Sequence, residues 1–579
     1  MTELGVMNLA EEAAQRALNS IFQCILERKN FRLEAGAGAG KTYSLVKALK
    51  FIIEKQGLYL QRNRQQVACI TYTNVATDQI KSRTDSHPVV NASTIHAFCW
   101  SLIKTFQPFL RSKLLEISGW PEKLEEIGGI GCRAIDYDLG YRRAKPGDPN
   151  VFLNHDDVLE LTVCLMKEQK FRDILTARFP IIFIDEYQDT NSAIAQAIIE
   201  HFIGTGKGPL IGLFGDSWQK IYRDVCGLID HENLTIIRKE ANFRSVKSIV
   251  DALNNMRPEL PQQVTDPYAA GSVTVYHSNA WTGTRRTGSH WVGDLPADVA
   301  HSHLTHVRHL LETEGWDFAP EKTKILMLTH NILASEQNYS GIADAFEYPE
   351  SYIKKEDPHI KFLVETLEPA CIAYKNGRYG EMFSAVGGRL GHIRTIDDKR
   401  AWAQDMDKLI ELREGGTTGQ VLDHLKAVTR PLLPDSVRLT ESDLSEASPE
   451  VVAESRTLNQ ISKLRAISYQ QISALSQFLN DHTPFATKHG VKGAEFENVL
   501  IVLGRGWNQY NWSQFLEWAQ GHIPNEKVDS YIRNRNLFYV ACSRPKQRLA
   551  LLFTQKLSSQ AVTTLTGWFG NSAIKSIVI

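Results

Sequence analysis

Hydrophobic and polar positions follow two different periods in the first part of the chain. Residues 8–29 carry apolar side chains at helical spacing, whereas residues 31–35 alternate as a strand does. A glycine-rich turn, a helix over residues 42–54 and a strand over residues 67–72 come next. This strand–turn–helix–strand order predicts a parallel α/β unit.

Short apolar runs predict further strands of the buried, parallel kind. Two of them, residues 181–184 and 210–214, extend the first unit. Three more, residues 325–329, 499–503 and 549–553, are separated by helical stretches late in the chain. We therefore expect an α/β protein with two parallel-sheet cores.

The segments between these strands read as helical and predict insertions into both cores. At about 150 residues per domain, a chain of 579 residues suggests about four domains. The predicted division is a first core over residues 1–98 and 179–234, a mainly helical insertion over 99–178, a second core over 235–345 and 479–579, and a mainly helical insertion over 346–478.

Composition narrows the class of protein without naming a partner. Hydrophobic residues make up 43% and charged residues 23%, which is typical of a globular protein and excludes overall disorder or a fibre. The net charge of −1 gives no bulk attraction for nucleic acid, although a local groove can still be basic. No signal peptide or long apolar run is evident, and none of the eight cysteines forms a C-x-x-C pair. We expect a cytoplasmic protein with reduced thiols and no membrane partner.

The strongest local feature is the segment AGAGAGKT between a predicted strand and a predicted helix. Glycines let the backbone turn its N–H groups toward phosphates, Lys41 can reach the β and γ phosphates, and Thr42 can bind Mg²⁺. The alternative is a flexible Gly/Ala turn, because the generic pattern starts with glycine where this chain has Ala35. The predicted phosphate-binding residues are Ala35, Gly36, Ala37, Gly38, Ala39, Gly40, Lys41 and Thr42.

Two acids follow the strand over residues 181–184. Asp185 would stand at the carboxyl edge of the sheet, where it can hold Mg²⁺ near Thr42. Glu186 is then placed to orient or deprotonate the attacking water. Acids after a strand are often only solvated loop residues, but beside a phosphate loop they predict nucleoside triphosphate hydrolysis.

The string DEYQDTN over residues 185–191 resembles the second motif of UvrD/Rep/PcrA-like superfamily I helicases. That family's loop typically starts with alanine, as at Ala35. Further segments resemble the family's other motifs in the same order: residues 70–76, 94–98, 213–223, 241–245, 487–496 and 536–546. The resemblance implies two RecA-like motor domains, each with a mainly helical insertion.

The same resemblance implies roles around ATP. Arg244 and Arg544 would join Lys41 around the γ-phosphoryl group, where negative charge spreads in the transition state. For Arg544 the alternative is an exposed basic cluster with Lys546 and Arg548. The implied catalytic residues are Lys41, Asp185, Glu186, Gln219, Arg244 and Arg544. The implied ATP contacts also include Gln188 as a sensor, Glu495 at the ribose, Phe243 stacking on adenine where the family usually has tyrosine, and Gln15 reading adenine.

A groove for single-stranded nucleic acid needs phosphate donors and flat rings. The motifs imply such contacts at Tyr72, Thr73, Asn74, Thr94 and His96, and at Tyr222, Thr487, His489 and Lys492. Taken alone, a histidine or tyrosine is more often a packing residue. Asp224 stands where the family usually has another base-stacking aromatic, so movement along DNA could be weaker or differently gated.

The resemblance implies an ATP-dependent DNA helicase or translocase that needs Mg²⁺ and moves 3′ to 5′ on single-stranded or forked DNA. The alternative is an ATP- and DNA-sensing regulatory subunit of a separate nuclease, an arrangement that resembles the UvrD-like subunits of Gabija-type antiphage systems. The 35 residues after Arg544 are too few for a nuclease domain, which fits this alternative. A DNA-binding scaffold without ATP turnover is disfavoured because all six catalytic candidates are present.

Overall fold

The structure is a computed structural model that describes residues 8–137, 142–221, 225–288, 291–327, 334, 336–347, 350–353, 355–387, 395–480, 483, 485–486, 494–504 and 510–577. Tyr222, Asp224, Thr487, His489 and Lys492 lie outside the described residues. The chain forms two compact units, and each is described by itself. The first comprises Met1–Val273, Trp518–Arg548 and Thr564–Asn571, and the second comprises Thr274–Glu517, Leu549–Thr563 and Ser572–Ile579.

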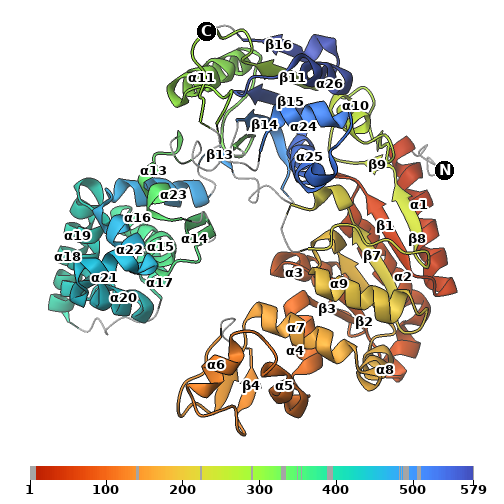
Figure 1. Ribbon diagram of the computed structural model, residues 1–579, viewed down its shortest axis with the longest axis horizontal. Helices are drawn as coiled ribbons and strands as arrows, with labels where there is room; N and C mark the ends of the chain where they lie inside the picture. The colour runs from red at the N-terminus through yellow and green to blue at the C-terminus, as the bar shows by residue number, and fades with distance from the viewer. Residues whose placement is uncertain are drawn as a thin grey trace. The chain divides into compact units, whose positions relative to one another are not determined.

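The first unit is built on a six-stranded sheet in the order β3-β2-β6-β7-β1-β8 (Figure 1). All of its neighbouring strands run parallel. The strands are β1 (Phe31–Ala35), β2 (Val67–Thr71), β3 (Val90–Thr94), β6 (Ile181–Asp185), β7 (Leu210–Gly215) and β8 (Thr235–Lys239). Because β7 lies between β1 and β6, the loops that follow these three strands meet at one edge.

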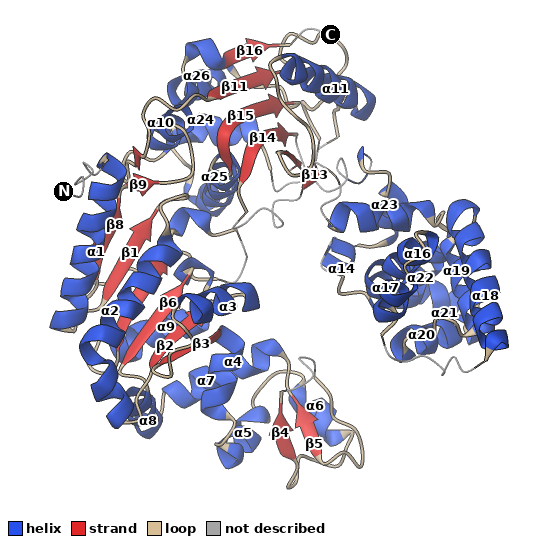
Figure 2. Ribbon diagram, turned by 180° about the vertical axis from the view of Figure 1, so that it is seen from behind, coloured by secondary structure: helices blue, strands red, loops and turns tan. Residues whose placement is uncertain are grey.

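Helices cover both faces of this sheet (Figure 2). Side chains of a strand alternate in direction, so Phe31 and Leu33 pack on one face while Ile182 and Ile184 pack on the other. The first face is covered by α1 (Leu9–Glu27) and α2 (Lys41–Arg62). The second is covered by α4 (Ile95–Ile103), α7 (His155–Met166), α8 (Gln169–Arg178) and α9 (Ser192–Ile198).

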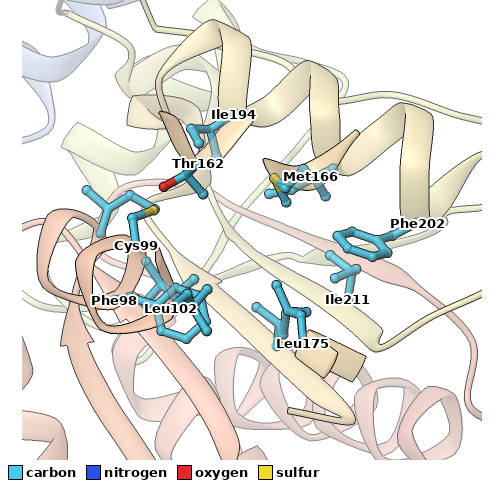
Figure 3. A pocket seen from close by; sticks show the side chains of 13 residues that line it. Phe98, Cys99, Leu102, Thr162, Met166, Leu175, Ile194, Phe202 and Ile211 are labelled. Carbon is cyan, nitrogen blue, oxygen red and sulfur yellow. The ribbon is translucent and has the colours of Figure 1, made fainter. Parts of the chain in front are cut away.

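A cavity of ≈ 30 Å³ remains between the second face and its helices (Figure 3). Its lining is almost wholly hydrocarbon, including Phe98, Leu102 and Met166 from the helices and Ile211 from the sheet. Small apolar cavities of this kind stay dry. It is therefore a packing defect of the core and not a binding site.

The insertion predicted over residues 99–178 is mainly helical. Besides α7 and α8 it contains α5 (Gln107–Leu114) and α6 (Trp120–Glu125), together with a small parallel pair, β4 (Ala134–Asp136) and β5 (Asn150–Phe152). Helix α3 (Asn74–Arg83) follows β2.

The structure corrects the predicted division between the two cores. The first core was predicted to end at residue 234, but β8 pairs with β1 in register from Thr235 to Lys239. The assignment of residues 235–239 to the second core is therefore wrong, because their backbone completes the edge of the first sheet. The first unit also holds β9 (Ala241–Asn242), α10 (Lys247–Met256), β10 (Gln263–Val264) and α25 (Val528–Cys542). These four elements were predicted in the second core, so that part of the division is wrong as well.

The second unit contains another six-stranded sheet, in the order β13-β12-β14-β15-β11-β16. Its strands are β11 (Ser272–His277), β12 (Thr323–Met327), β13 (Phe485–Ala486), β14 (Phe496–Leu503), β15 (Pro545–Phe553) and β16 (Ile574–Ser576). The pairs β12–β13, β12–β14 and β11–β16 run parallel. The helices next to these strands in the chain are α11 (Ala297–Thr313), α24 (Trp512–Ala519) and α26 (Ser559–Phe569).

The insertion predicted over residues 346–478 is also mainly helical. It follows α13 (Ser340–Ala345) and contains α14 (Glu350–Ile353), α15 (Pro358–Phe362), α16 (Glu368–Lys375), α17 (Tyr379–Ala385), α18 (Ile396–Gly415), α19 (Thr418–Val428), α20 (Asp435–Glu446), α21 (Pro449–Glu454), α22 (Arg456–Ala466) and α23 (Gln470–Leu479). The predicted fold class, two parallel-sheet cores with mainly helical insertions, is confirmed. Within the described ranges, none of the helices is both long and apolar enough to cross a membrane.

Candidate active site

The glycine-rich loop connects β1 to α2 with a backbone that requires glycine. Gly38 and Gly40 have φ angles of +78° and +72°, which side-chain-bearing residues rarely adopt. A Cβ on Gly36 would lie 2.7 Å from the Gln262 amide nitrogen and 3.1 Å from the Tyr539 hydroxyl. The flexible-turn alternative is therefore unnecessary, since the loop is folded tightly against its neighbours at the start of a helix, where anions bind well.

Lys41 and the two acids after β6 lie together. The Lys41 ammonium is 3.6 Å from the Glu186 carboxylate. Burial and the neighbouring Glu186 charge raise the pKa of Asp185 to about 7, although Lys41 opposes the rise. Thr42 and Asp185 offer the hard oxygen ligands that Mg²⁺ prefers, and a cation there would favour the ionised form of Asp185. The residues present thus fit a magnesium nucleotide.

A chain of polar contacts leads from Glu186 to the loop after β7. Gln188 is fully buried; its amide nitrogen donates to Glu186, and its amide oxygen accepts from the backbone N–H of Asp216 at 3.0 Å. Gln219 donates from its amide nitrogen to the Asp216 carboxylate at 2.8 Å. Gln188 and Gln219, both implied by the motifs, therefore contact Asp216.

Arg244 and Arg544 lie in ranges that were predicted for the second core, but the structure places both in the first unit. Arg544 is only 1% exposed, and its guanidinium donates to the Gln219 side-chain oxygen at 3.3 Å and to the Val540 carbonyl at 2.9 Å. Burial and the nearby Arg244 lower the pKa of Arg544 to about 9. Arg244 donates to the Ser543 carbonyl at 3.0 Å. The exposed basic cluster considered for Arg544 is excluded, because its side chain is buried.

Three side chains that the motifs did not single out hold the loop. Asn242 and Gln262 both donate to the Ala37 carbonyl, at 3.1 and 3.2 Å. The Lys239 ammonium donates to the Gly40 carbonyl at 3.0 Å and to the Ser44 hydroxyl at 2.7 Å. Lys239 is fully buried, and burial lowers its pKa to about 8.

Two exposed rings lie near the Lys239 ammonium. Phe243 and Tyr43 are 45% and 52% exposed, and the Lys239 ammonium is 5.8 and 5.9 Å from their ring centres. Phe243 also donates its backbone N–H to the Gly38 carbonyl at 2.9 Å. An exposed ring fixed to the loop in this way is compatible with base stacking.

Two further predicted ATP contacts, Gln15 and Glu495, are exposed. Gln15 lies on the exposed face of α1, and its amide donates to Asn19 one turn later at 2.9 Å. Ala14 and Ala17 occupy the face of α1 that packs inward, so Gln15 lies on the outer face, and its role in reading adenine stays a prediction. Glu495 belongs to the second unit, and its role at the ribose stays a prediction.

The predicted strand contacts of the first core gather at one sheet edge. Strands β2 and β3 are neighbours with Thr71 opposite Thr94, so the residues after both strands meet there. Thr73 and Thr94 accept hydrogen bonds from the first turns of α3 and α4, at 3.1 and 3.4 Å, and thus start these helices. Asn74 is exposed beside Thr73.

The two aromatic candidates at this edge are partly buried. Tyr72 is packed against the core, and burial raises the pKa of its phenol. The His96 ring centre is 4.7 Å from that of His155 in the insertion, and burial together with His155 lowers the pKa of His96. The hydroxyl of Tyr72 is buried, so only the ring of this residue can contact a nucleic-acid strand.

Comparison with known proteins gives two family matches and several relatives. The family models for the AAA domain and for the UvrD-like helicase C-terminal domain match residues 18–224 and 321–556. The Gabija protein GajB of Bacillus cereus (strain HuB5-5) is 24% identical over 93% of this chain and 95% of its own length. The ATP-dependent DNA helicase PcrA of Bacillus subtilis (strain 168) is 25% identical over 39% of this chain and 37% of its own length. The PcrA protein of Staphylococcus aureus (strain Mu50 / ATCC 700699) is 25% identical over 38% of this chain and 37% of its own length.

Proposed function

The chain belongs to the UvrD-like helicase superfamily, and we propose that it is an ATP-dependent motor that moves 3′ to 5′ along single-stranded DNA. One observation carries the proposal: the phosphate loop, the acids after β6 and the buried Arg544 are connected by side-chain contacts within one compact unit. Such an arrangement surrounds a γ-phosphoryl group with the cations that its transfer requires.

Each side chain then has a defined task in ATP hydrolysis. Lys41, Arg244 and Arg544 stabilise the negative charge that develops on the γ-phosphoryl oxygens. Glu186 accepts the proton of the attacking water, and its contacts with Lys41 and Gln188 keep the carboxylate oriented. Thr42 and Asp185 would hold Mg²⁺, which would supply further positive charge next to the phosphates of ATP.

Coupling between nucleotide and DNA is supported by the sheet itself. Asp185 ends β6, and β2 pairs with β6 in register. The residues after β2, Thr73 and Asn74, therefore stand at the same carboxyl edge as the acids that handle ATP. A change of charge at Asp185 and Glu186 can therefore be transmitted through the paired strands β6 and β2 to single-stranded DNA bound along this edge.

The decisive test is ATP turnover by the purified chain with a panel of nucleic acids. We expect single-stranded and forked DNA to raise the turnover and blunt duplex to do so less. Translocation direction is then read from displacement of a blocking protein from either end of a single strand. An ATPase that is indifferent to single-stranded DNA would exclude a motor.

A second candidate is a regulatory subunit that senses ATP and DNA for a separate nuclease. The share of each relative's length that this chain matches favours this candidate. GajB is matched over 95% of its length, whereas the helicase PcrA of Bacillus subtilis is matched over 37%. The test is co-expression with any nuclease encoded beside this chain. A stable complex whose cleavage responds to ATP supports this candidate, while separate elution and vigorous unwinding by the lone chain support the motor.

A further inference from the structure

Glu34, the penultimate residue of β1, is a buried carboxylate with an unusual number of partners. It is 7% exposed and lies in a strand whose five residues are all buried. Its oxygens accept from the Tyr187 hydroxyl at 2.7 Å and from the backbone N–H and hydroxyl of Ser217 at 2.9 and 2.7 Å. The strand that leads into the phosphate loop is thus fixed to the segments that follow β6 and β7.

Arg257, just after α10, connects this carboxylate to a second one. One terminal nitrogen of its guanidinium donates to Glu34 at 2.7 Å, and the other donates to Asp216 at 2.6 Å. Arg257 is 3% exposed and Asp216 is fully buried. The guanidinium also lies 5.1 and 5.8 Å from the ring centres of Trp218 and Tyr539.

Asp216 connects Arg257 to Gln219 and, through Gln219, to Arg544. Its second carboxylate oxygen accepts from the Gln219 amide nitrogen, which leaves the Gln219 oxygen to accept from Arg544 at 3.3 Å. A glutamine amide has a donor end and an acceptor end, so fixing its nitrogen on Asp216 decides which way its oxygen points. Arg257 is therefore two contacts away from Gln219 and three from Arg544.

Stability alone gives little reason for such a cluster. Taking charges out of water is costly, and replacing a buried ion pair by apolar side chains is often neutral or stabilising. The charged cluster instead fixes geometry. The planar guanidinium of an arginine can hold two carboxylates at fixed positions, which an apolar contact cannot do.

We propose that Arg257 is a positioning residue for ATP hydrolysis, which holds Asp216 against Glu34 so that the Gln219 oxygen is presented to Arg544. The proposal rests on the proposed function, since the step that it serves is γ-phosphoryl transfer. Arg257 acts through Gln219 and does not itself contact the nucleotide.

The test is a double-variant cycle on ATP turnover, followed by γ-phosphate release from labelled ATP so that residual activity stays measurable. Arg257→Lys keeps the charge but cannot span both carboxylates, and we expect kcat to fall at least about 10-fold with KM changed less than about 3-fold. Since Arg257 acts through Gln219, the variant Arg257→Lys/Gln219→Ala should match Gln219→Ala alone within about 3-fold. If the decreases in kcat of the two single variants multiply in the double variant, the proposal is wrong.

A matched control separates positioning from a general loss of stability. Arg413 holds Glu368 with a bidentate contact of 2.7 and 2.9 Å in the helical insertion, and Arg413→Lys makes the same chemical change there. We expect it to lower the melting temperature while kcat stays unchanged. If Arg257→Lys behaves in the same way, its role is structural and the proposal is wrong.

The two proposals fail in different ways. A wild-type chain without ATP turnover refutes the proposed function. Positioning is still tested then by a crystal structure of Arg257→Lys, in which we expect the Gln219 amide to leave Asp216 and its contact with Arg544 to be lost. A structure that retains both contacts would refute positioning, whatever the turnover.

Discussion

Arg544 donates to the side-chain oxygen of Gln219 at 3.3 Å, although 325 residues separate the two along the chain. Both side chains are almost completely buried. A buried guanidinium whose pKa is lowered to about 9 is short of compensating negative charge, and Arg244 beside it adds to that deficit. Such a pair of cations would be stabilised by an anion, and a triphosphate held by the adjacent loop supplies one.

Removing either principal cation should abolish most ATP turnover. We expect Lys41→Ala and Arg544→Ala each to lower kcat by about 100-fold or more, because each removes charge stabilisation from the transition state. The measurement is steady-state phosphate release at saturating single-stranded DNA. Lys50→Ala, an exposed position on the same helix as Lys41, is the control and should turn over normally. Near-normal turnover in either main variant would refute the site assignment.

Glu186→Gln should separate binding from chemistry. The amide keeps a similar size and can still accept from Gln188, but it cannot take a proton from water. We expect turnover to fall by about 100-fold or more while the dissociation constants for ATP and single-stranded DNA stay within a few-fold of wild type. Equilibrium binding with the slow variant measures both constants. Loss of ATP binding would mean that Glu186 holds the nucleotide and is not the base.

The strands of the first core could be read from sequence because buried parallel strands are continuous apolar runs. The runs predicted over residues 31–35, 67–72, 181–184 and 210–214 correspond to Phe31–Ala35, Val67–Thr71, Ile181–Asp185 and Leu210–Gly215. The helix after the loop extends to Arg62, beyond the predicted end at residue 54, because Gly57 lowers helix propensity without ending the helix. The grouping of Lys41 with Glu186 was predicted from the phosphate-loop motif and from the acids that follow the apolar run over residues 181–184.

The buried cluster could not be predicted, because its members are far apart in the chain and carry no periodic signal. Arg257 and Glu34 are 223 residues apart, and Arg257 reads as a polar residue at the end of a helix. The one available signal was Glu34 itself, an acid between apolar strand residues. Lys239 was missed for the same reason, since a lysine near a strand end is usually solvated.

Lys239 should give the first unit a measurable dependence on alkaline pH. Its folded-state pKa of about 8 lies below the usual 10.5, so between these values the unfolded chain binds more protons and stability rises with pH. Compared with Lys239→Met, the wild type should gain up to about 3 kcal/mol of unfolding free energy from pH 8 to pH 10.5. Arg544 titrates in a similar range but is present in both proteins. Parallel stability curves for the two proteins would show that Lys239 is not buried as a cation.

Glu441 should be the residue on which the packing of the second unit's helical insertion depends most. It is fully buried on α20, and its carboxylate contacts His359 at 3.3 Å, Lys426 at 2.8 Å and the guanidinium of Arg465. These partners come from three other helices, α15, α19 and α22. Glu441→Gln removes the negative charge that all three partners contact. Among the described residues, Asp423 alone then faces both Lys426 and Arg465, so we expect a loss of about 3–5 kcal/mol.

The same residue predicts an acid-sensitive step. Its partners lower the pKa of Glu441 to about 2, below the usual 4.5, so its contribution is complete above pH 4.5 and is lost as pH falls toward 2. Thermal unfolding and limited proteolysis of the insertion, followed between pH 7 and pH 3, should show this loss in the wild type and a much weaker pH dependence in Glu441→Gln. Asp443→Asn, an exposed change on the same helix, is the control and should resemble the wild type. If both variants unfold as the wild type does, the buried carboxylate does not hold the four helices together.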